Sequence, residues 1–180
     1  MIKIEITDSG VMDAFNRLIA FGENPQGSLM AIGEKVVDFT KQRFDLSVDP
    51  YGNPWAPNSD TTLRAALHRS DKNFTKKGAL SKKGAAFLAG KKPLIGDSKS
   101  LSTHFSYRVV EGNSVIVSSP MIYAAMQNFG GSKAEFPNLW GDIPARPFFP
   151  NPEQGLPADL SQDIMTVLRD ALQNARDGIS

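Results

Sequence analysis

The first quarter of the chain changes from an alternating apolar pattern to a helical one. The chain begins with three isoleucines separated by polar residues, Ile2, Ile4 and Ile6. This is the spacing of a half-buried strand. Asp8 and Ser9, two residue types that cap helices, come next. The apolar residues that follow share one helical face, and they are Val11, Phe15, Leu18 and Ile19. The pattern predicts a strand and then a helix that Gly22 and Pro25 end.

A second, longer helix is predicted from about Ser28. Its apolar residues recur at helical spacing, and they are Leu29, Ile32, Val36, Phe39 and Phe44. Lys35, Lys41 and Arg43 fill polar positions between them. Pro50 closes the helix, because proline has no backbone N–H to continue the hydrogen bonds.

The loop after this helix reads Asp49-Pro50-Tyr51-Gly52-Asn53-Pro54-Trp55-Ala56-Pro57. Prolines and a glycine around two aromatic residues favour an ordered turn over a flexible linker. We therefore expect Trp55 to be largely buried. Two explanations stay open, since Tyr51 and Trp55 either hold the loop on their own domain or belong to a contact between subunits. Residues 61–69 can form a short helix.

Residues 70–100 are rich in lysine and glycine, and we interpret them as a mobile basic arm. Ala85-Ala86-Phe87-Leu88 gives the arm some capacity to pack when a partner is present. The alternative is a solvated flexible loop. The lysines that we consider for contact with a partner or with DNA are Lys72, Lys76, Lys77, Lys82, Lys83, Lys91, Lys92 and Lys99.

The charges of the chain are unevenly distributed. Residues 63–104 hold ten lysines and arginines against two aspartates, a net charge of +8. Because the whole chain carries only +1, the remainder carries −7. A basic segment on an acidic body favours contact with nucleic acid or docking onto an acidic neighbour, another copy of the same chain included.

Alternation returns after the arm. The residues expected on one side of a strand are Leu101, Thr103, Phe105, Tyr107 and Val109. A turn at 111–114 and a returning strand from 115 complete a β-hairpin. Residues 121–129 suit a short helix that Gly130-Gly131 stops. The prolines of 143–150 allow only an extended segment or a sheet edge.

The last helix has the clearest pattern and follows Pro157. Its apolar face consists of Leu160, Ile164, Val167, Leu168, Leu172 and Ala175. Together the elements predict an α+β fold with N-terminal helices, a small antiparallel sheet, a C-terminal helix and a long basic arm at about 70–100. A length of 180 residues fits a single domain over residues 1–180.

Several classes of function find no support in the residues. There are no cysteines for disulfides or thiolate sites, and no phosphate-binding glycine loop, nucleophile elbow or metal-ligand spacing. His68 and His104 fall in different predicted elements, and Asp45 and Asp49 fit a helix end and a turn better than an acid–base pair. No stretch nears the ~20 apolar residues of a membrane span. We expect no enzyme activity, no cofactor, no metal and no membrane contact. We expect the protein to be made and used in a reducing cytoplasm, or in a particle that is assembled there.

Three motifs in a fixed order resemble a known family. They are the loop Asp49-Pro50-Tyr51-Gly52-Asn53-Pro54-Trp55, the pair Tyr123-Ala124 and Phe129-Gly130, and the segment Ile143-Pro144-Ala145-Arg146-Pro147-Phe148. With the closing helix, this order is similar to the phage virion morphogenesis family of Mu-like virion and tail-completion proteins. The resemblance covers roughly residues 10–175. The resemblance implies a structural role in assembly for the motif residues, which are Asp49, Gly52, Trp55, Tyr123, Ala124, Phe129, Gly130, Ala145, Arg146, Pro147 and Phe148.

The resemblance implies a structural protein of a tailed bacteriophage that completes the tail end or the head–tail joint. Its expected partners are further copies in a ring (a hexamer), neighbouring tail-tube or neck and connector proteins, and genome DNA in non-specific contact where residues face a lumen. We expect the protein in the virion, assembled in the host cytoplasm.

Two other classes of function stay open on the residues alone. The first alternative is a nucleic-acid-binding module that uses the lysine-rich 70–100 segment. A third, weaker alternative is a hydrolase of a cell-wall or nucleic-acid polymer. Arg146 stands between Ala145 and Pro147 on a stiff backbone, so we expect it to make a structural contact with a carboxylate or with carbonyls and to take no part in bond chemistry.

Overall fold

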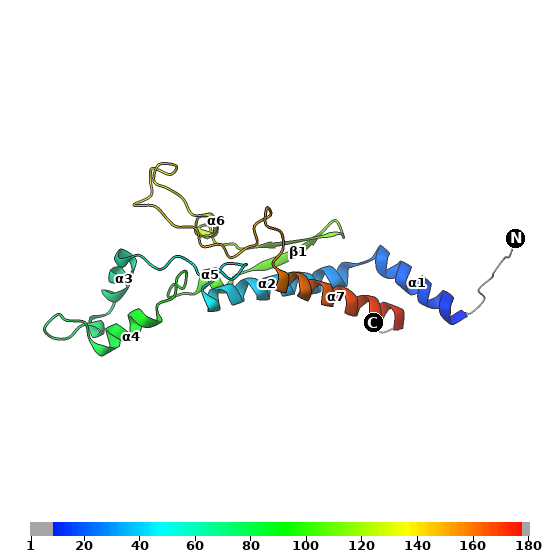
Figure 1. Cartoon of the computed structure of the whole chain (residues 1–180), viewed down its shortest axis with the longest axis horizontal. Coiled ribbons are helices and arrows are strands. Elements are labelled where there is room, and N and C mark those ends of the chain that lie inside the picture. The colour runs from blue at the N-terminus through cyan, green and yellow to red at the C-terminus, as the bar shows by residue number, and fades with distance from the viewer. Residues whose placement is uncertain (1–8, 178–180) are drawn as a thin grey trace. The chain divides into compact units, whose positions relative to one another are not determined.

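The computed structural model describes residues 9–177, without the side chains of residues 9–12, 14 and 15. The strand predicted at Ile2–Ile6, the cap at Asp8 and the side chains of Val11 and Phe15 lie outside this description. The described chain combines helices with a two-stranded antiparallel sheet and has a long C-terminal helix, so the predicted α+β class is confirmed (Figure 1).

The chain packs as two compact units that interleave along the sequence. The first unit takes the described parts of residues 1–39, 105–118 and 152–180, and the second takes residues 40–104 and 119–151. A single domain over residues 1–180 stays a prediction. The three sequence motifs all fall in the second unit.

Three helices and the hairpin make up the described part of the first unit. Helix α1 spans Ser9–Glu23, α2 spans Gln26–Leu46, and α7 spans Ala158–Asp177. The first unit includes α2 as far as Phe39. Helix α1 packs against α7, and a guanidinium nitrogen of Arg17 donates to the carbonyl of Arg176 at 3.0 Å. The predicted apolar face of α7 is confirmed at Leu160, which is fully buried, whereas Leu172 at the other end is exposed.

The hairpin consists of β1 (Ser106–Val110) and β2 (Ser114–Ser118), with Arg108 opposite Ile116 in the register. The prediction that this strand begins at Leu101 is wrong. Residues Ser100–Thr103 instead form a short helix, α5, which belongs to the second unit. The side chain of Leu101 is buried from this helix and does not lie on a strand. From Ser106 onward the predicted alternation holds, since Tyr107 and Val109 are half-buried on either side of an exposed Arg108.

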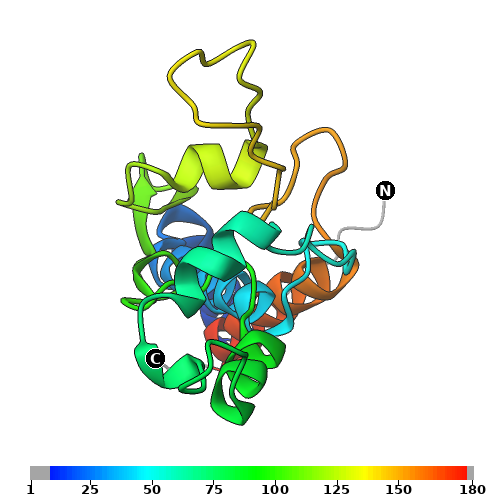
Figure 2. The ribbon, with the colours of Figure 1, turned by 90° about the vertical axis from the view of Figure 1, so that its left-hand side faces the viewer.

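The second unit contains α3 (Asp60–Leu67), the 3-10 turn η1 (Asp71–Asn73), α4 (Lys82–Gly90) and α6 (Ala124–Phe129), in addition to α5 and the end of α2. Figure 2 shows α3, α4 and α6 from a second side. Helix α3 confirms the short helix predicted at 61–69, and α6 starts three residues later than the predicted helix at 121–129.

The segment 70–100, predicted as a mobile arm, has regular structure of its own. Ser81 caps α4, since its hydroxyl accepts from the Gly84 N–H at 3.1 Å and donates to the Lys72 carbonyl at 2.9 Å. Asn73 is buried and donates to the Leu67 carbonyl at 2.8 Å. A β-carbon at Gly84 would collide with the Asn73 carbonyl, so a glycine lets α4 pack on η1. Lysine and glycine content hid this packing from the sequence analysis.

A close contact between the hairpin and α2 orders the first unit. The ring of Tyr107 lies where a β-carbon of Gly33 would stand, and the Tyr107 hydroxyl donates to a carboxylate oxygen of Glu34 at 3.1 Å. Gly33 is buried in the middle of α2, where glycine is otherwise unfavourable. Close approach of the ring therefore explains this glycine.

We expect Gly33→Ala to lower the free energy of unfolding. Alanine gains about 1 kcal/mol in helix propensity over glycine, but overpacking against Tyr107 costs about 1–3 kcal/mol. Gly27→Ala is the matched control in the same helix, because a β-carbon added there would meet nothing within 4 Å. Urea unfolding of both variants checks this, and equal stability of the two would show that Tyr107 moves aside at no cost.

Candidate functional site

The three motifs, far apart in the sequence, meet in the second unit. We call their assembly the motif cluster and define it as the loop 49–57, helix α6 with its glycine exit, and the strip 143–151. Hydrogen bonds run from the strip to both other parts. The structure therefore brings together the residues that the sequence motifs singled out.

Asp49 organises the loop 49–57. One oxygen of its carboxylate accepts from the backbone N–H groups of Tyr51 and Asn53, each at 2.8 Å, and the other accepts from the Asn53 side-chain amide at 2.9 Å. Gly52 has φ +90°, a conformation that suits glycine. The loop closes on an isolated β-bridge between Val48 and Pro54. Asp49 thus acts as a turn former, as the sequence indicated.

Trp55 is buried within its own chain, with 6% of its surface exposed, and this prediction is confirmed. Its ring meets Phe44 edge-on at 5.2 Å between centroids, and Phe44 in turn contacts the fully buried Phe148 at 5.3 Å. The indole N–H donates to the Pro147 carbonyl at 2.7 Å. Trp55 therefore anchors the loop to the strip by both packing and a buried hydrogen bond.

Arg146 holds the same two segments together through a second set of hydrogen bonds. Its Nε donates to the Ala56 carbonyl at 2.7 Å, and Nη2 donates to the Pro57 carbonyl at 2.8 Å. The side chain is buried, and this burial lowers the pKa of Arg146 from its ordinary value. Arginine nevertheless keeps its charge at physiological pH, because its unperturbed pKa lies so far above it. The structural contact predicted for Arg146 is made to carbonyls within the chain.

Helix α6 binds the strip through a residue that the sequence analysis missed. The side-chain oxygen of buried Asn128 accepts from the backbone N–H groups of Phe148 and Phe149, at 3.0 and 3.2 Å. The backbone N–H of Arg146 donates to the Gln127 carbonyl at 2.9 Å. The polar Asn128 within an apolar helix was the available signal, since a buried amide must find partners.

Gly130 ends α6 with φ +74° and lets the strip approach. A β-carbon at this position would lie 2.7 Å from the Ala145 nitrogen. Beyond it, Gly131 and Ile143 exchange two backbone hydrogen bonds, at 2.9 and 2.8 Å. This bridge closes the base of the loop 132–142, which projects from the end of α6 (the yellow loop in Figure 2).

The motif cluster has an inner and an outer set of side chains. Trp55, Ala124, Arg146 and Phe148 are buried, whereas Phe129 is 77% exposed and Tyr123 is 43% exposed. Two more apolar residues that the sequence analysis missed are also exposed, Ile122 at 99% and Trp140 at 70%. The exposed apolar side chains at the two ends of α6 and in the loop 132–142 are therefore available for contact with another molecule.

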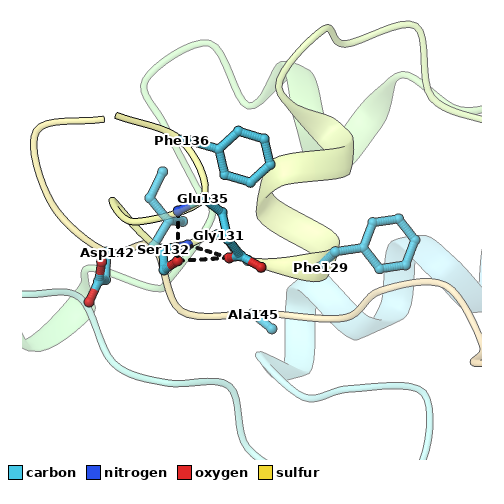
Figure 3. A pocket seen from close by; sticks show the side chains of 9 residues that line it. Phe129, Gly131, Ser132, Glu135, Phe136, Asp142 and Ala145 are labelled. Atoms are coloured by element: carbon cyan, nitrogen blue, oxygen red, sulfur yellow. Dashed lines mark hydrogen bonds between the residues drawn. The ribbon is translucent and has the colours of Figure 1, made fainter. Parts of the chain in front are cut away.

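A pocket of about 450 Å³ opens at the end of α6 (Figure 3). Phe129 and Phe136 contribute aromatic rings to its wall. Among the described residues that line it, the titratable ones are two carboxylates, Glu135 and Asp142. The Ser132 hydroxyl donates to Glu135 at 2.8 Å and lowers the pKa of that carboxyl, although the nearby charge of Asp142 opposes the effect. The pocket is therefore partly aromatic and negatively charged.

The lysines of the 70–100 segment differ in their surroundings. The ammonium groups of Lys91 and Lys92 donate to the carbonyls of Ile95 and Asp45, each at 2.7 Å, so both are engaged within the chain. The other six are exposed, and they are Lys72, Lys76, Lys77, Lys82, Lys83 and Lys99. A tight turn carries Lys76 and Lys77 between the bridged residues Phe74 and Leu80.

Other chemistry finds little room in the described part of the chain. His68 stacks on Phe74 at 4.8 Å, and the exposed His104 lies with its Nδ1 3.0 Å from the Ser100 carbonyl oxygen. Residues 9–177 contain no group of three or more His, Cys, Asp or Glu side chains placed to hold a metal ion. Over the same residues, no helix has the length and apolar character needed to cross a membrane.

We expect Arg146→Lys to destabilise the protein nearly as much as Arg146→Ala. A lysine keeps the charge but cannot reach both carbonyls as the planar guanidinium does. Hydrogen bonds to charged groups contribute about 1.5–3 kcal/mol, so each variant should lose about that amount in urea unfolding. Arg64→Lys on the exposed surface of α3 is the control and should change stability by less than about 0.5 kcal/mol. If Arg146→Lys were as stable as the wild type while Arg146→Ala lost stability, a positive charge at this position would be enough to stabilise the fold.

Comparison with known proteins agrees with the motif order. The model of the phage virion morphogenesis family matches residues 6–173, a range that contains the whole motif cluster. Neither a search of curated proteins nor a search of solved structures returned a match. The chain therefore belongs to the phage virion morphogenesis family, whose proteins serve the assembly of the phage virion.

Proposed function

We propose that the protein is a ring subunit that completes the phage tail end or the head–tail joint, as a tail-completion, terminator or neck protein. Its role in this proposal is structural and not catalytic. Its partners are further copies of itself in a hexamer and the adjoining tail-tube or connector proteins. The protein is assembled into the virion in the host cytoplasm.

The exposed apolar residues at α6 carry this proposal. The polar groups of the motif cluster are directed at its own backbone, as in the contacts of Asp49, Asn128 and Arg146. Such an arrangement produces a fixed scaffold rather than a reactive centre. Ile122 and Phe129 stand out from this scaffold, and burial of exposed apolar surface drives most protein association.

The lysines at the start of α4 support an external role for the basic segment. Lys82 and Lys83 occupy the first turn of the helix, where the helix dipole disfavours positive charge. These two charges therefore contribute nothing favourable to the helix that carries them. A neighbour with acidic groups gives them a favourable setting, and head-to-tail contacts in a ring bring two different surfaces of one subunit together.

A second candidate function rests on the turn Thr75–Ala79. Two adjacent lysines, Lys76 and Lys77, stand at its tip, and a pair of charges on a projecting turn also suits phosphate groups. In this alternative the protein is a nucleic-acid-binding module. Strong, salt-dependent retention of DNA by a protein that never contacts another copy would favour it over the ring.

A reconstruction of the virion tests the ring. We expect several copies of the chain around the tail axis, each in contact with the next copy. Purified protein alone can remain monomeric if the tail tube templates the ring, so the particle is the decisive sample. One isolated copy, without contact to another, would refute the proposed function.

Neutralising the exposed lysines should damage assembly more than folding. With Lys76, Lys77, Lys82 and Lys83 changed to glutamine, we expect thermal stability to stay the same or rise slightly, because exposed charges contribute little and two of these oppose the helix dipole. The yield of infectious particles should fall. Lys35→Gln with Arg169→Gln, two exposed cationic residues outside the basic segment and the loop 132–142, is the control. Full infectivity of the fourfold variant would remove the segment from the assembly surface.

A further inference from the structure

We propose that the pocket at the end of α6 receives the turn Thr75–Leu80 of a neighbouring copy of the chain. This inference rests on the proposed ring, and it names the two surfaces that meet at each contact. The pocket is the socket, and the turn, which we call the basic turn, is the part that enters it.

The chemistry of the pocket specifies its occupant. Phe129 and Phe136 offer aromatic faces, and Glu135 and Asp142 offer negative charge. Aromatic rings bind both apolar side chains and cations, and carboxylates bind lysine ammonium groups. A volume of about 450 Å³ accommodates a few side chains and not a folded domain. The pocket therefore suits a narrow protrusion that carries both an apolar residue and lysines.

The basic turn has this composition and is ordered in advance. Lys76 and Lys77 stand at its tip, and Leu80 at its end is 44% exposed. The Thr75 N–H donates to the Ala79 carbonyl at 2.7 Å, and the Gly78 N–H donates to the Thr75 carbonyl at 2.9 Å. Because these bonds already fix the backbone, the turn loses little conformational entropy when it docks.

The placement of the two surfaces requires a second copy. The basic turn and the pocket both belong to the second unit, and both views place the turn beside α4, well apart from the loop 132–142 (Figures 1 and 2). A chain therefore does not fill its own pocket. Contacts between two different surfaces of identical subunits are heterologous, and they close into rings when the rotation permits.

Disulfide trapping tests the contact, and the chain suits it because it contains no cysteine. Lys77→Cys and Ala145→Cys place one thiol at the tip of the turn and one in the pocket wall. We expect the double variant, assembled on tails under oxidising conditions, to form covalent dimers and longer ladders, because a disulfide needs α-carbons within about 7 Å. The matched control pairs Lys77→Cys with Arg108→Cys on exposed β1 and should remain uncrosslinked.

A charge exchange provides the second test. Lys76→Glu with Lys77→Glu should weaken contact between copies by roughly tenfold or more at low salt, because like charges then face each other. Adding Glu135→Lys and Asp142→Lys to the same chain should restore most of it. Trapping detects the contact even if the fourfold variant folds poorly.

The outcomes separate the inference from the proposed function. Ring particles in which neither trapping nor charge exchange involves the pocket would overturn the inference and leave the ring in place. A wild-type virion in which copies never touch would overturn both. Two results would support both proposals. Covalent ladders would form with Lys77→Cys/Ala145→Cys and not with the Arg108→Cys control, and the charge exchange would restore the contact between copies.

Discussion

The proline-rich strip 143–151 cannot pair its backbone in a regular ladder. The motif cluster supplies individual hydrogen-bond partners in place of that ladder. Three of its positions are proline and donate no backbone hydrogen bond. Side chains from elsewhere meet the strip one group at a time, as Trp55 does at the Pro147 carbonyl and Asn128 at the Phe148 N–H. Arg146 of the strip donates in turn to carbonyls of the loop 49–57. The loop and the strip each complete the hydrogen bonding of the other, so loss of one contact leaves buried groups unsatisfied on both sides.

The motif residues assigned by resemblance divide according to this constraint. Asp49, Gly52, Trp55, Gly130 and Arg146 have turn, packing or hydrogen-bonding duties inside the chain. The side chains that reach outward include two motif residues, Tyr123 and Phe129, and two residues of no motif, Ile122 and Trp140. The motifs therefore identify the scaffold and only part of its outer surface. The rest of that surface consists of residues that no motif singles out.

The sequence predicted most where one residue carries its own signal. Burial of Trp55 followed from the prolines around it, and the fixed direction of Arg146 followed from Pro147. Asn128 signalled only that a buried amide needs partners. The sequence could not identify these partners, because they lie twenty residues further along the chain and only the fold brings them close. The structure of the 70–100 segment was missed for another reason. Its composition suggested a flexible arm, while the decisive features were the single cap Ser81 and the buried amide of Asn73.

The bridge between Gly131 and Ile143 has a consequence for how such a protein can change over time. Two backbone hydrogen bonds close the loop 132–142 at its base, next to the point where the strip meets α6. Backbone bonds depend little on which side chains stand beyond them. Changes at the tip of the loop are therefore separated from the scaffold, whereas Phe136 lies against Gly131 and belongs to the pocket. We expect a loop grafted from a relative to change this outer surface, the pocket included, without rebuilding the fold that carries it.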